Sequence, residues 1–193
     1  MSATRRRRAD GEQTRATILD AATRLATVEG LDGLSIGSLA DHIGMSKSGL
    51  YAHFGSKEEL QLAAIDTATE IFADNVIRPA RDADTALGRL EALCENFFRY
   101  LERPVFPGGC FFASATAELD THPGPVREKL VHSLDGWLAL IERRVREAQE
   151  AGELDAFMKM GNSLRVLHGG RSGLAQARVA IAARLDRARV TKT

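Results

Sequence analysis

Apolar residues recur every three to four positions along most of the chain, which is the spacing that places them on one face of an α-helix. In the first such segment, from about 12 to 29, the expected buried face comprises Ile18, Ala22, Leu25 and Ala26. Gly30 follows this segment, and glycine commonly supplies the left-handed residue that ends a helix. No segment alternates apolar and polar residues for long enough to indicate a sheet. The pattern therefore predicts an all-α fold.

Two short helices are expected next, each with its own start signal. Ser35 can cap a second helix, which Gly44 ends, and Ser46 opens a third helix over about 47 to 53. Serine favours this position because its side-chain oxygen accepts a hydrogen bond from an unpaired backbone N–H of the first turn. The sequence thus predicts a compact three-helix head at the N-terminus.

A long fourth helix is expected to begin at Ser56 and to continue to about residue 78. Glu59 lies three residues after Ser56, which is the spacing of a capping box, and Pro79 then ends the helix. Further helices, which bring the expected total to about nine, are predicted at about 85–102, 110–119, 125–150, 156–167 and 174–188.

Composition and charge exclude some classes of protein without selecting one. The 26 Lys and Arg residues balance the 26 Asp and Glu residues, so a nucleic-acid partner must be recognised from a local feature. The chain has two cysteines and no apolar stretch of the roughly 20 residues that cross a membrane, and we expect a cytoplasmic protein with no membrane partner. No histidine shows a metal-binding spacing, and no cofactor is expected.

A basic run of four arginines, Arg5 to Arg8, precedes the first periodic segment. We interpret residues 1–11 as a flexible basic tail. Such a tail is either simply solvated or reaches DNA phosphates, and the sequence leaves both interpretations open.

The spacing of small residues between positions 36 and 53 favours a helix-turn-helix. Two short helices can cross closely where one presents a small side chain, as at Ala40, and the reversal needs a residue that tolerates positive φ, as at Gly44. The apolar wedge beneath the turn is expected to comprise Leu39, Ile43, Met45 and Leu50. The alternative is an ordinary helical hairpin with a solvated polar face.

The stretch LYAHFGSKEEL, residues 50 to 60, resembles the stretch by which the TetR/AcrR family is recognised, and residues 34 to 60 resemble the whole family signature. The resemblance implies a DNA-binding transcriptional regulator. Its head, residues 12–56, would be joined by the fourth helix to a larger helical domain, residues 57–193, that binds a ligand and dimerises.

The resemblance also implies a set of DNA-contacting residues. Residues at the start of the second helix would approach the DNA backbone, those of the third helix would face bases and phosphates, and Tyr51, His53 and Lys57 would contact phosphates. The complete set is Ser35, Gly37, Ser46, Lys47, Ser48, Gly49, Tyr51, His53 and Lys57. The chemistry agrees for Lys57, which lies at a helix N-terminus where the dipole attracts the same anion. Gly37 and Gly49 stand where longer side chains often occur, so no operator sequence is predicted.

The larger domain is expected to hold a small-molecule effector among aromatic side chains. The candidate ligand-binding residues are Phe97, Phe98, Phe106, Cys110, Phe111 and Trp137. Each ring could equally fill a helical core. The long C-terminal helices carry broad apolar stripes that can pair with a second copy, and a homodimer would read a palindromic operator.

Cys110 offers two alternative functions. The helix start after Gly108 and Gly109 can lower a thiol pKa, so oxidation or electrophiles at Cys110 could gate DNA binding instead of a ligand. An enzyme with Cys110 as nucleophile and His122 or His132 as base lacks a supporting motif, and we expect no enzymatic activity. The sequence favours a repressor released from its operator by a small-molecule ligand.

Overall fold

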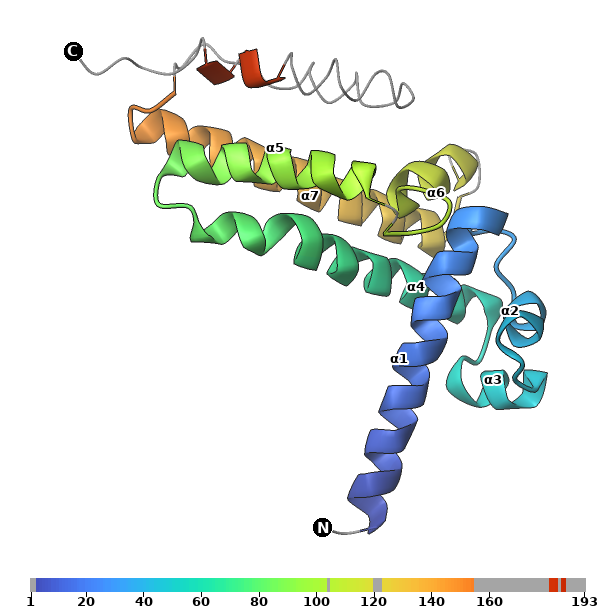
Figure 1. Ribbon diagram of the computed structural model, residues 1–193. Coiled ribbons are helices and arrows are strands. Elements are labelled where there is room, and N and C mark those ends of the chain that lie inside the picture. Colours follow the sequence, from blue (N-terminus) through green and yellow to red (C-terminus); the bar gives the residue numbers. More distant parts are fainter. Residues whose placement is uncertain (1–2, 104, 120–122, 155–180, 184, 187–193) are drawn as a thin grey trace. The chain divides into compact units, whose positions relative to one another are not determined.

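A computed structural model of the chain describes residues 3–103, 105–119, 123–154, 181–183 and 185–186 (Figure 1). Over these residues the chain forms helices joined by turns and contains no strand. The all-α fold predicted from the sequence is confirmed.

The chain divides into two compact units. Unit 1 comprises Met1–Ile71 and Pro104–Ser133, and unit 2 comprises Phe72–Arg103 and Leu134–Thr193. Each unit is therefore built from two separate stretches of the chain. Residues 104–133 group with the N-terminal helices, although they follow the boundary that we expected at residue 56 by almost fifty positions.

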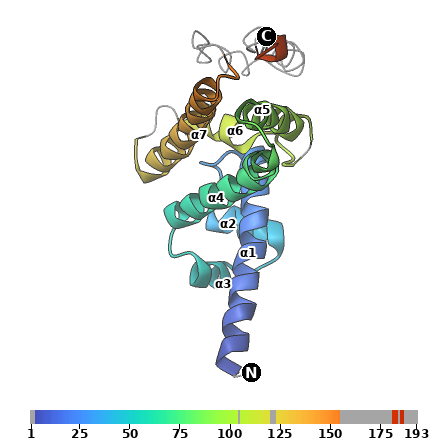
Figure 2. The same ribbon diagram turned by 90° about the vertical axis from the view of Figure 1, so that its left-hand side faces the viewer.

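Helix α1, Ala3–Glu29, begins nine residues before the predicted start, so the arginine run lies within the helix rather than before it. Alanine and arginine are good helix formers, but they carry no apolar periodicity that would mark the start. The predicted buried face is confirmed, since Ile18, Ala22 and Ala26 are at most 2% exposed. Helices α2, Ile36–Ile43, and α3, Lys47–His53, lie beside α1 in both side views (Figures 1 and 2).

Helix α4, Lys57–Phe72, starts where the sequence predicts and then changes form before Pro79. A single π-helical turn, Ala73–Ile77, continues it, and Pro79 begins the 3-10 turn Pro79–Asp82. A proline is accommodated there because the first residue of a helical turn needs no N–H partner. The helical path to about residue 78 is as predicted, whereas the change of helical form has no signal in the apolar pattern.

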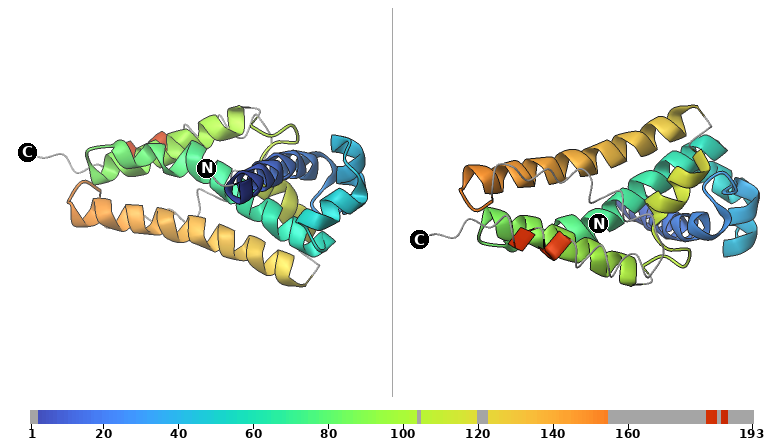
Figure 3. Two further views of the ribbon diagram at one scale, coloured as in Figure 1. Left: turned by 90° about the horizontal axis from the view of Figure 1, so that it is seen from below. Right: turned by 90° about the horizontal axis from the view of Figure 1, so that it is seen from above.

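The remaining described helices are α5, Ala86–Glu102, α6, Phe111–Leu119, and α7, Pro125–Glu150. All three lie within one residue of their predicted ranges. Helix α7 is one uninterrupted rod that begins at Pro125 (Figure 3). Leu130, Ile141 and Ala148 bury one side of α7, whereas Leu138 lies off that side and is 44% exposed.

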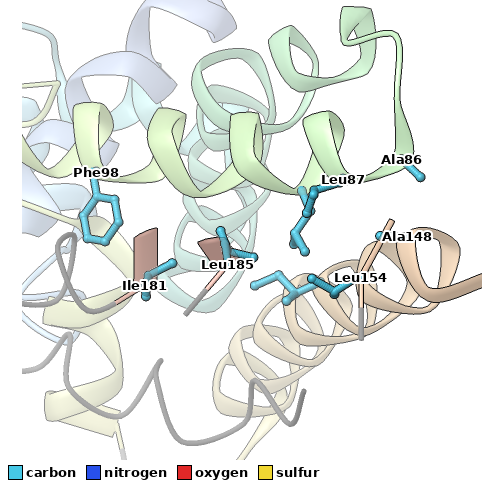
Figure 4. Packing of buried hydrophobic residues seen from close by; sticks show 9 residues of the cluster. Ala86, Leu87, Phe98, Ala148, Leu154, Ile181 and Leu185 are labelled. Atoms are coloured by element: carbon cyan, nitrogen blue, oxygen red, sulfur yellow. The ribbon is translucent and has the colours of Figure 1, made fainter. Parts of the chain in front are cut away.

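The core of unit 2 forms between α5, α7 and the C-terminal stretch (Figure 4). Its buried members are Ala86, Leu87, Leu90, Phe98, Ile141, Ala148, Leu154, Ile181 and Leu185. Ile181 and Leu185 are four residues apart, which places them on one side of a helix, as the sequence predicts for this segment. The predicted helix over 156–167, and much of the one over 174–188, lie outside the described residues.

Among the described residues, no helix combines the length and the apolar character needed to cross a membrane.

Candidate nucleic-acid interface

The N-terminus of α2 is fixed by a reciprocal pair of serines. The backbone N–H of Ser38 donates to Ser35 Oγ at 3.0 Å, and the N–H of Ser35 donates to Ser38 Oγ at 3.1 Å. Ser35 was predicted as the cap, whereas the return bond from Ser38 was not, since the usual partner at that position is Glu or Gln. This first turn carries the positive end of the helix dipole, a suitable place for a DNA phosphate.

The turn between α2 and α3 depends on Gly44. Its φ of 68° and ψ of 26° lie in the left-handed region, and its N–H donates to the carbonyl of Ala40. The predicted reversal at Gly44 is therefore confirmed. The wedge beneath it is smaller than predicted: Leu39 and Leu50 are fully buried, whereas Ile43 and Met45 are only partly buried at the edge of this small unit.

Helix α3 presents a polar, exposed surface. Ser46, Lys47, Ser48 and Tyr51 are exposed, with 56% of the Tyr51 surface accessible, while Leu50 points inward. Ser46 caps the helix, because its Oγ accepts the N–H of Gly49 at 3.1 Å, and it also lies 3.2 Å from Ser48 Oγ. The face can offer hydroxyl and ammonium donors to base edges and phosphates, as a recognition helix requires.

The two glycines that leave this face sparse have packing causes. A Cβ on Gly37 would lie 3.6 Å from Lys47 Nζ, so the lysine side chain of α3 lies beside the first turn of α2. A Cβ on Gly49 would lie 3.1 Å from the capping Ser46 Oγ, which is tighter than most contacts of this kind. Gly37 thus leaves room for the Lys47 ammonium beside α2, and Gly49 leaves room for the Ser46 hydroxyl that caps α3.

Arg15 of α1 joins the end of α3 to α1. Its guanidinium donates to the carbonyl of His53 and lies 4.2 Å from the centre of the buried Phe54 ring. His53 itself is partly buried at the last turn of α3, and Phe54 belongs to the buried core. Sequence reasoning missed Arg15, because it lies off the apolar face and its partners are 38 and 39 positions away.

Lys57, at the first position of α4, forms an ion pair with Asp32 at 2.9 Å. Both side chains remain about half exposed, at 46% and 60%, so the ammonium stays accessible to a phosphate. Ser56 Oγ caps the helix through the N–H of Glu59 at 3.0 Å, as predicted. The carboxylate of Glu59 accepts the N–H of Gly55 at 2.9 Å, which shifts the expected capping box by one residue.

The six candidate ligand-binding residues fall in different units. In unit 2, Phe97 packs against Trp137 at 5.7 Å between ring centres and against Phe98 at 6.4 Å. In unit 1, the buried rings of Phe106 and Phe111 lie 6.2 Å apart. Cys110 belongs to unit 1 and directly precedes α6, where its carbonyl accepts the N–H of Ser114 at 3.1 Å.

Sequence reasoning did not identify Phe72 as part of the aromatic group of unit 2. Its ring contacts Trp137 edge-on at 5.1 Å and Phe97 at 6.0 Å. Phe72 ends α4, just before the π-helical turn whose presence the sequence did not reveal. Phe72 is buried, whereas Trp137 and Phe97 are only partly buried, so part of this aromatic group is accessible.

The two cysteines differ in their surroundings. Burial, with a smaller contribution from the Glu91 carboxylate, raises the pKa of the Cys94 thiol to about 11. Cys94 packs against the core of unit 2, as expected of a core residue. Of the histidines named as possible bases for Cys110, His132 is exposed on α7, and His122 lies outside the described residues.

A capped α2, a glycine turn and an exposed polar α3 define the class of helix-turn-helix proteins. Two family models match the chain: "Bacterial regulatory proteins, tetR family" over residues 18–64, and "Tetracyclin repressor-like, C-terminal domain" over residues 86–191. The chain belongs to the TetR family and is a DNA-binding transcriptional regulator. This family is not enzymatic.

Similar proteins span part or nearly all of the chain. The transcriptional activator FasR of Mycolicibacterium smegmatis is 32% identical over 47% of this chain, and the match covers only 42% of FasR. The regulator TtgR of Pseudomonas putida is 26% identical over 79% of this chain and 75% of its own length. A solved TetR regulator from Chloroflexus aurantiacus matches with a TM-score of 0.74 and 27% identity, covering 93% of this chain and 91% of its own.

Proposed function

We propose that the protein is a homodimeric repressor that binds a palindromic operator and is released from it by a small-molecule ligand. Residues 12–56 form the DNA-binding domain. Residues 57–193, of which 104–133 group with the N-terminal helices, supply ligand binding and dimerisation. Residues 1–11 add basic charge next to the DNA-binding domain, where arginines can attract phosphates.

The exposed face of α3 is the observation that carries the operator-binding proposal. Tyr51 is one of the few large side chains with apolar surface that the described residues expose, and the exposed Lys47 and Ser48 precede it by one helical turn. A tyrosine left 56% exposed contributes little to the core, whereas its hydroxyl can donate to a phosphate oxygen. The Lys47 ammonium beside Gly37 and the Lys57 ammonium at the start of α4 supply charge to the same partner.

The aromatic group of unit 2 supports a ligand site in the second domain. Phe72, Phe97 and Trp137 meet edge-on or tilted, and two of the three are only partly buried. Ligand pockets are commonly lined by such aromatic side chains. An apolar or aromatic small molecule is the ligand class that fits them.

Helix α7 supports the homodimer. Val131 and Leu138 are 38% and 44% exposed, and their spacing of seven residues places them on one side of the helix. Two such helices related by a two-fold axis can bury these side chains against each other. The dimer then presents two copies of α3 to the two halves of a palindrome.

Electrophoretic mobility shift with DNA from the regions flanking the protein's own gene tests the proposal. We expect binding that competitor DNA of unrelated sequence does not abolish, and at least a tenfold loss of affinity for Tyr51→Ala, the order of one to two lost phosphate or base contacts. Val28→Ala is the matched control, because Val28 is also exposed, at 64%, but lies on α1, one residue before that helix ends at Glu29.

No sequence-preferential binding, or equal binding by Tyr51→Ala, would contradict the proposal. Transcription of the bound gene in vitro then gives the direction of control. A repressor lowers the transcript and an added ligand restores it, whereas an increase on protein addition would replace repression with activation, the role named for FasR.

A further inference from the structure

The loop between α1 and α2 is held by a carboxylate that is distant in the sequence. Glu118 of α6 accepts the backbone N–H of Leu31 at 2.7 Å through Oε2 and that of Asp32 at 2.8 Å through Oε1. All of these residues belong to unit 1. Both oxygens are thus used on two consecutive amide groups, and a charged acceptor strengthens each bond.

Gly30 shapes this site. Its φ is 86°, in the left-handed region, which turns the next two N–H groups toward the same point. A Cβ on Gly30 would lie 2.6 Å from Glu118 Oε1, so a side chain there would displace the carboxylate. The close approach of Glu118 therefore needs a glycine at position 30.

Two side chains of α4 hold the other side of the same loop. Gln61 is buried, and its Nε2 donates to the Leu31 carbonyl at 2.6 Å. Lys57 pairs with Asp32 at 2.9 Å. Leu31 and Asp32 are therefore held from α6 through their N–H groups and from α4 through a carbonyl and a carboxylate. Three residues later, the chain reaches Ser35, which caps α2.

The segment that carries Glu118 is itself fixed to the last turns of α1. Thr27 Oγ1 accepts the N–H of Gly108 at 3.1 Å, and the Arg24 guanidinium donates to the Val105 carbonyl at 3.3 Å. Phe106 and Phe111 are buried beside these contacts. The loop before α6 is thereby bonded to α1, and this fixes the helix from which Glu118 contacts the loop before α2.

We infer that Glu118 is a positioning residue for operator recognition: its carboxylate fixes the loop before α2, and through it the α2 cap and the adjacent Lys47. The inference rests on the operator binding proposed above. Both carboxylate oxygens of Glu118 already accept backbone N–H groups of the loop, and a carboxylate would repel a DNA phosphate. Its loss should therefore weaken recognition of the correct sequence without removing a phosphate contact.

The variant Glu118→Gln tests this inference in the full-length protein. The amide keeps the size of the side chain, but it loses the charge and turns an NH₂ group toward one of the two N–H donors. We expect about a tenfold weaker operator affinity per active molecule, as follows from losing a charge-assisted bond. Non-specific DNA affinity, and the slope of operator affinity against salt concentration, should stay unchanged.

The matched control is Glu153→Gln in unit 2, since Glu153 Oε2 accepts the N–H of Leu87 at 2.7 Å. It removes the same kind of bond and should leave operator affinity unchanged. Stoichiometric titration counts the active fraction of each variant, which separates misfolding from a change in affinity. Gly30→Ala should weaken the operator affinity as Glu118→Gln does. Because both changes act on the same contact, the double variant should lose no more binding free energy than the two single losses added together.

Operator affinity of Glu118→Gln equal to that of the wild type would overturn the inference and leave the proposed function intact. Equal losses on operator and unrelated DNA would also overturn it, because a positioning role predicts loss on the operator alone. Failure of the wild type to prefer any operator is the separate result that contradicts the proposed function. In that case, unchanged amide hydrogen exchange at Leu31 and Asp32 in Glu118→Gln would overturn the inference independently.

Discussion

Gly108 lies against the backbone of α1 with no room for a side chain. A Cβ on residue 108 would be 1.7 Å from the Thr27 carbonyl oxygen and 2.9 Å from the Thr27 Cβ. Gly108→Ala must therefore displace the loop that leads into α6. We expect its free energy of unfolding in urea to fall by about 1–3 kcal/mol, the range for overpacking a close contact.

Gly136→Ala provides the control, because a Cβ on Gly136 would meet nothing within 4 Å. Alanine in the interior of α7 should instead raise the free energy of unfolding by up to about 1 kcal/mol. Two substitutions of the same chemistry thus have opposite expected signs. A Gly108→Ala protein as stable as the wild type would show that the loop does not pack on α1 as described.

The two thiols should be separable by their rate of alkylation. Because the pKa of Cys94 is raised to about 11, its thiolate becomes the main form only as the pH passes that value. In a Cys110→Ser variant, we expect iodoacetamide to react with Cys94 at pH 7.5 roughly three hundred times more slowly than with an unperturbed thiol of pKa about 8.5, the ratio of the two thiolate fractions. Alkylation at the rate of free cysteine would contradict the burial of Cys94.

Thiol gating through Cys110 is tested by the same variant on DNA. If peroxide releases the wild-type protein from its operator and also releases Cys110→Ser, Cys110 is not the trigger. If only the wild type is released, thiol gating replaces the ligand as the signal.

At the scale of elements, the reciprocal bonds between Ser35 and Ser38 at the start of α2 should contribute measurably to the free energy of unfolding. Ser35→Ala removes the acceptor for the Ser38 N–H and should lower the free energy of unfolding by about 1 kcal/mol, the usual cost of losing a helix cap. Ser133→Ala, within α7, removes a hydroxyl that bonds back to the Lys129 carbonyl, makes a long 3.4 Å contact with the Thr69 hydroxyl and caps no helix, so it should change the stability less than Ser35→Ala does. Equal effects of the two changes would contradict the capping role of Ser35.

The start and end signals in the sequence predict most element boundaries because they act locally. Ser35 and Gly44 act through bonds to residues within four positions, and Pro125 acts through its own fixed φ and missing N–H. The helices that they bound were predicted within a residue or so. The start of α1 was missed because propensity alone extends it. The π-helical turn after Phe72 was missed because the apolar spacing does not distinguish π from α turns over so few residues.

The residues that we expect to contact DNA come from the stretch that resembles the family signature. Tyr51, Lys47 and Lys57 are exposed, as side chains that contact DNA would have to be. Arg15 and Glu118 were not predictable, since each acts on backbone groups 38 to 87 positions away and nothing in the local sequence marks them. A contact to a backbone atom does not depend on the side chain of the residue contacted, so the sequence at that position does not reveal it.

For the whole molecule, the division into two units differs from a simple order of head followed by body. Residues 104–133 belong with the N-terminal helices, because Thr27, Arg24 and the loop before α2 bind them. A reading along the chain assigns them to the larger domain.

The proposed homodimer is tested by placing a charge on α7. Leu138→Lys should lower the molar mass measured by light scattering from that of a dimer toward that of a monomer, because an unpaired ammonium would be buried between the two copies. Val28→Lys is the control, since Val28 is more exposed, at 64%, and lies on α1. A dimer unaffected by Leu138→Lys would show that this face of α7 is not the interface.

The central claim, that the surface formed by α2, α3 and the start of α4 binds operator phosphates, is tested most directly by the salt dependence of operator affinity. Each phosphate contact contributes a slope of about −0.9 in log affinity against log salt concentration. Lys57→Ala should reduce the magnitude of the slope by about 1 for each subunit that contacts the operator. Lys129→Ala, whose lysine is similarly paired, with Asp66 at 2.6 Å, should leave it unchanged. Equal slopes for the wild type, Lys57→Ala and Lys129→Ala would contradict the claim.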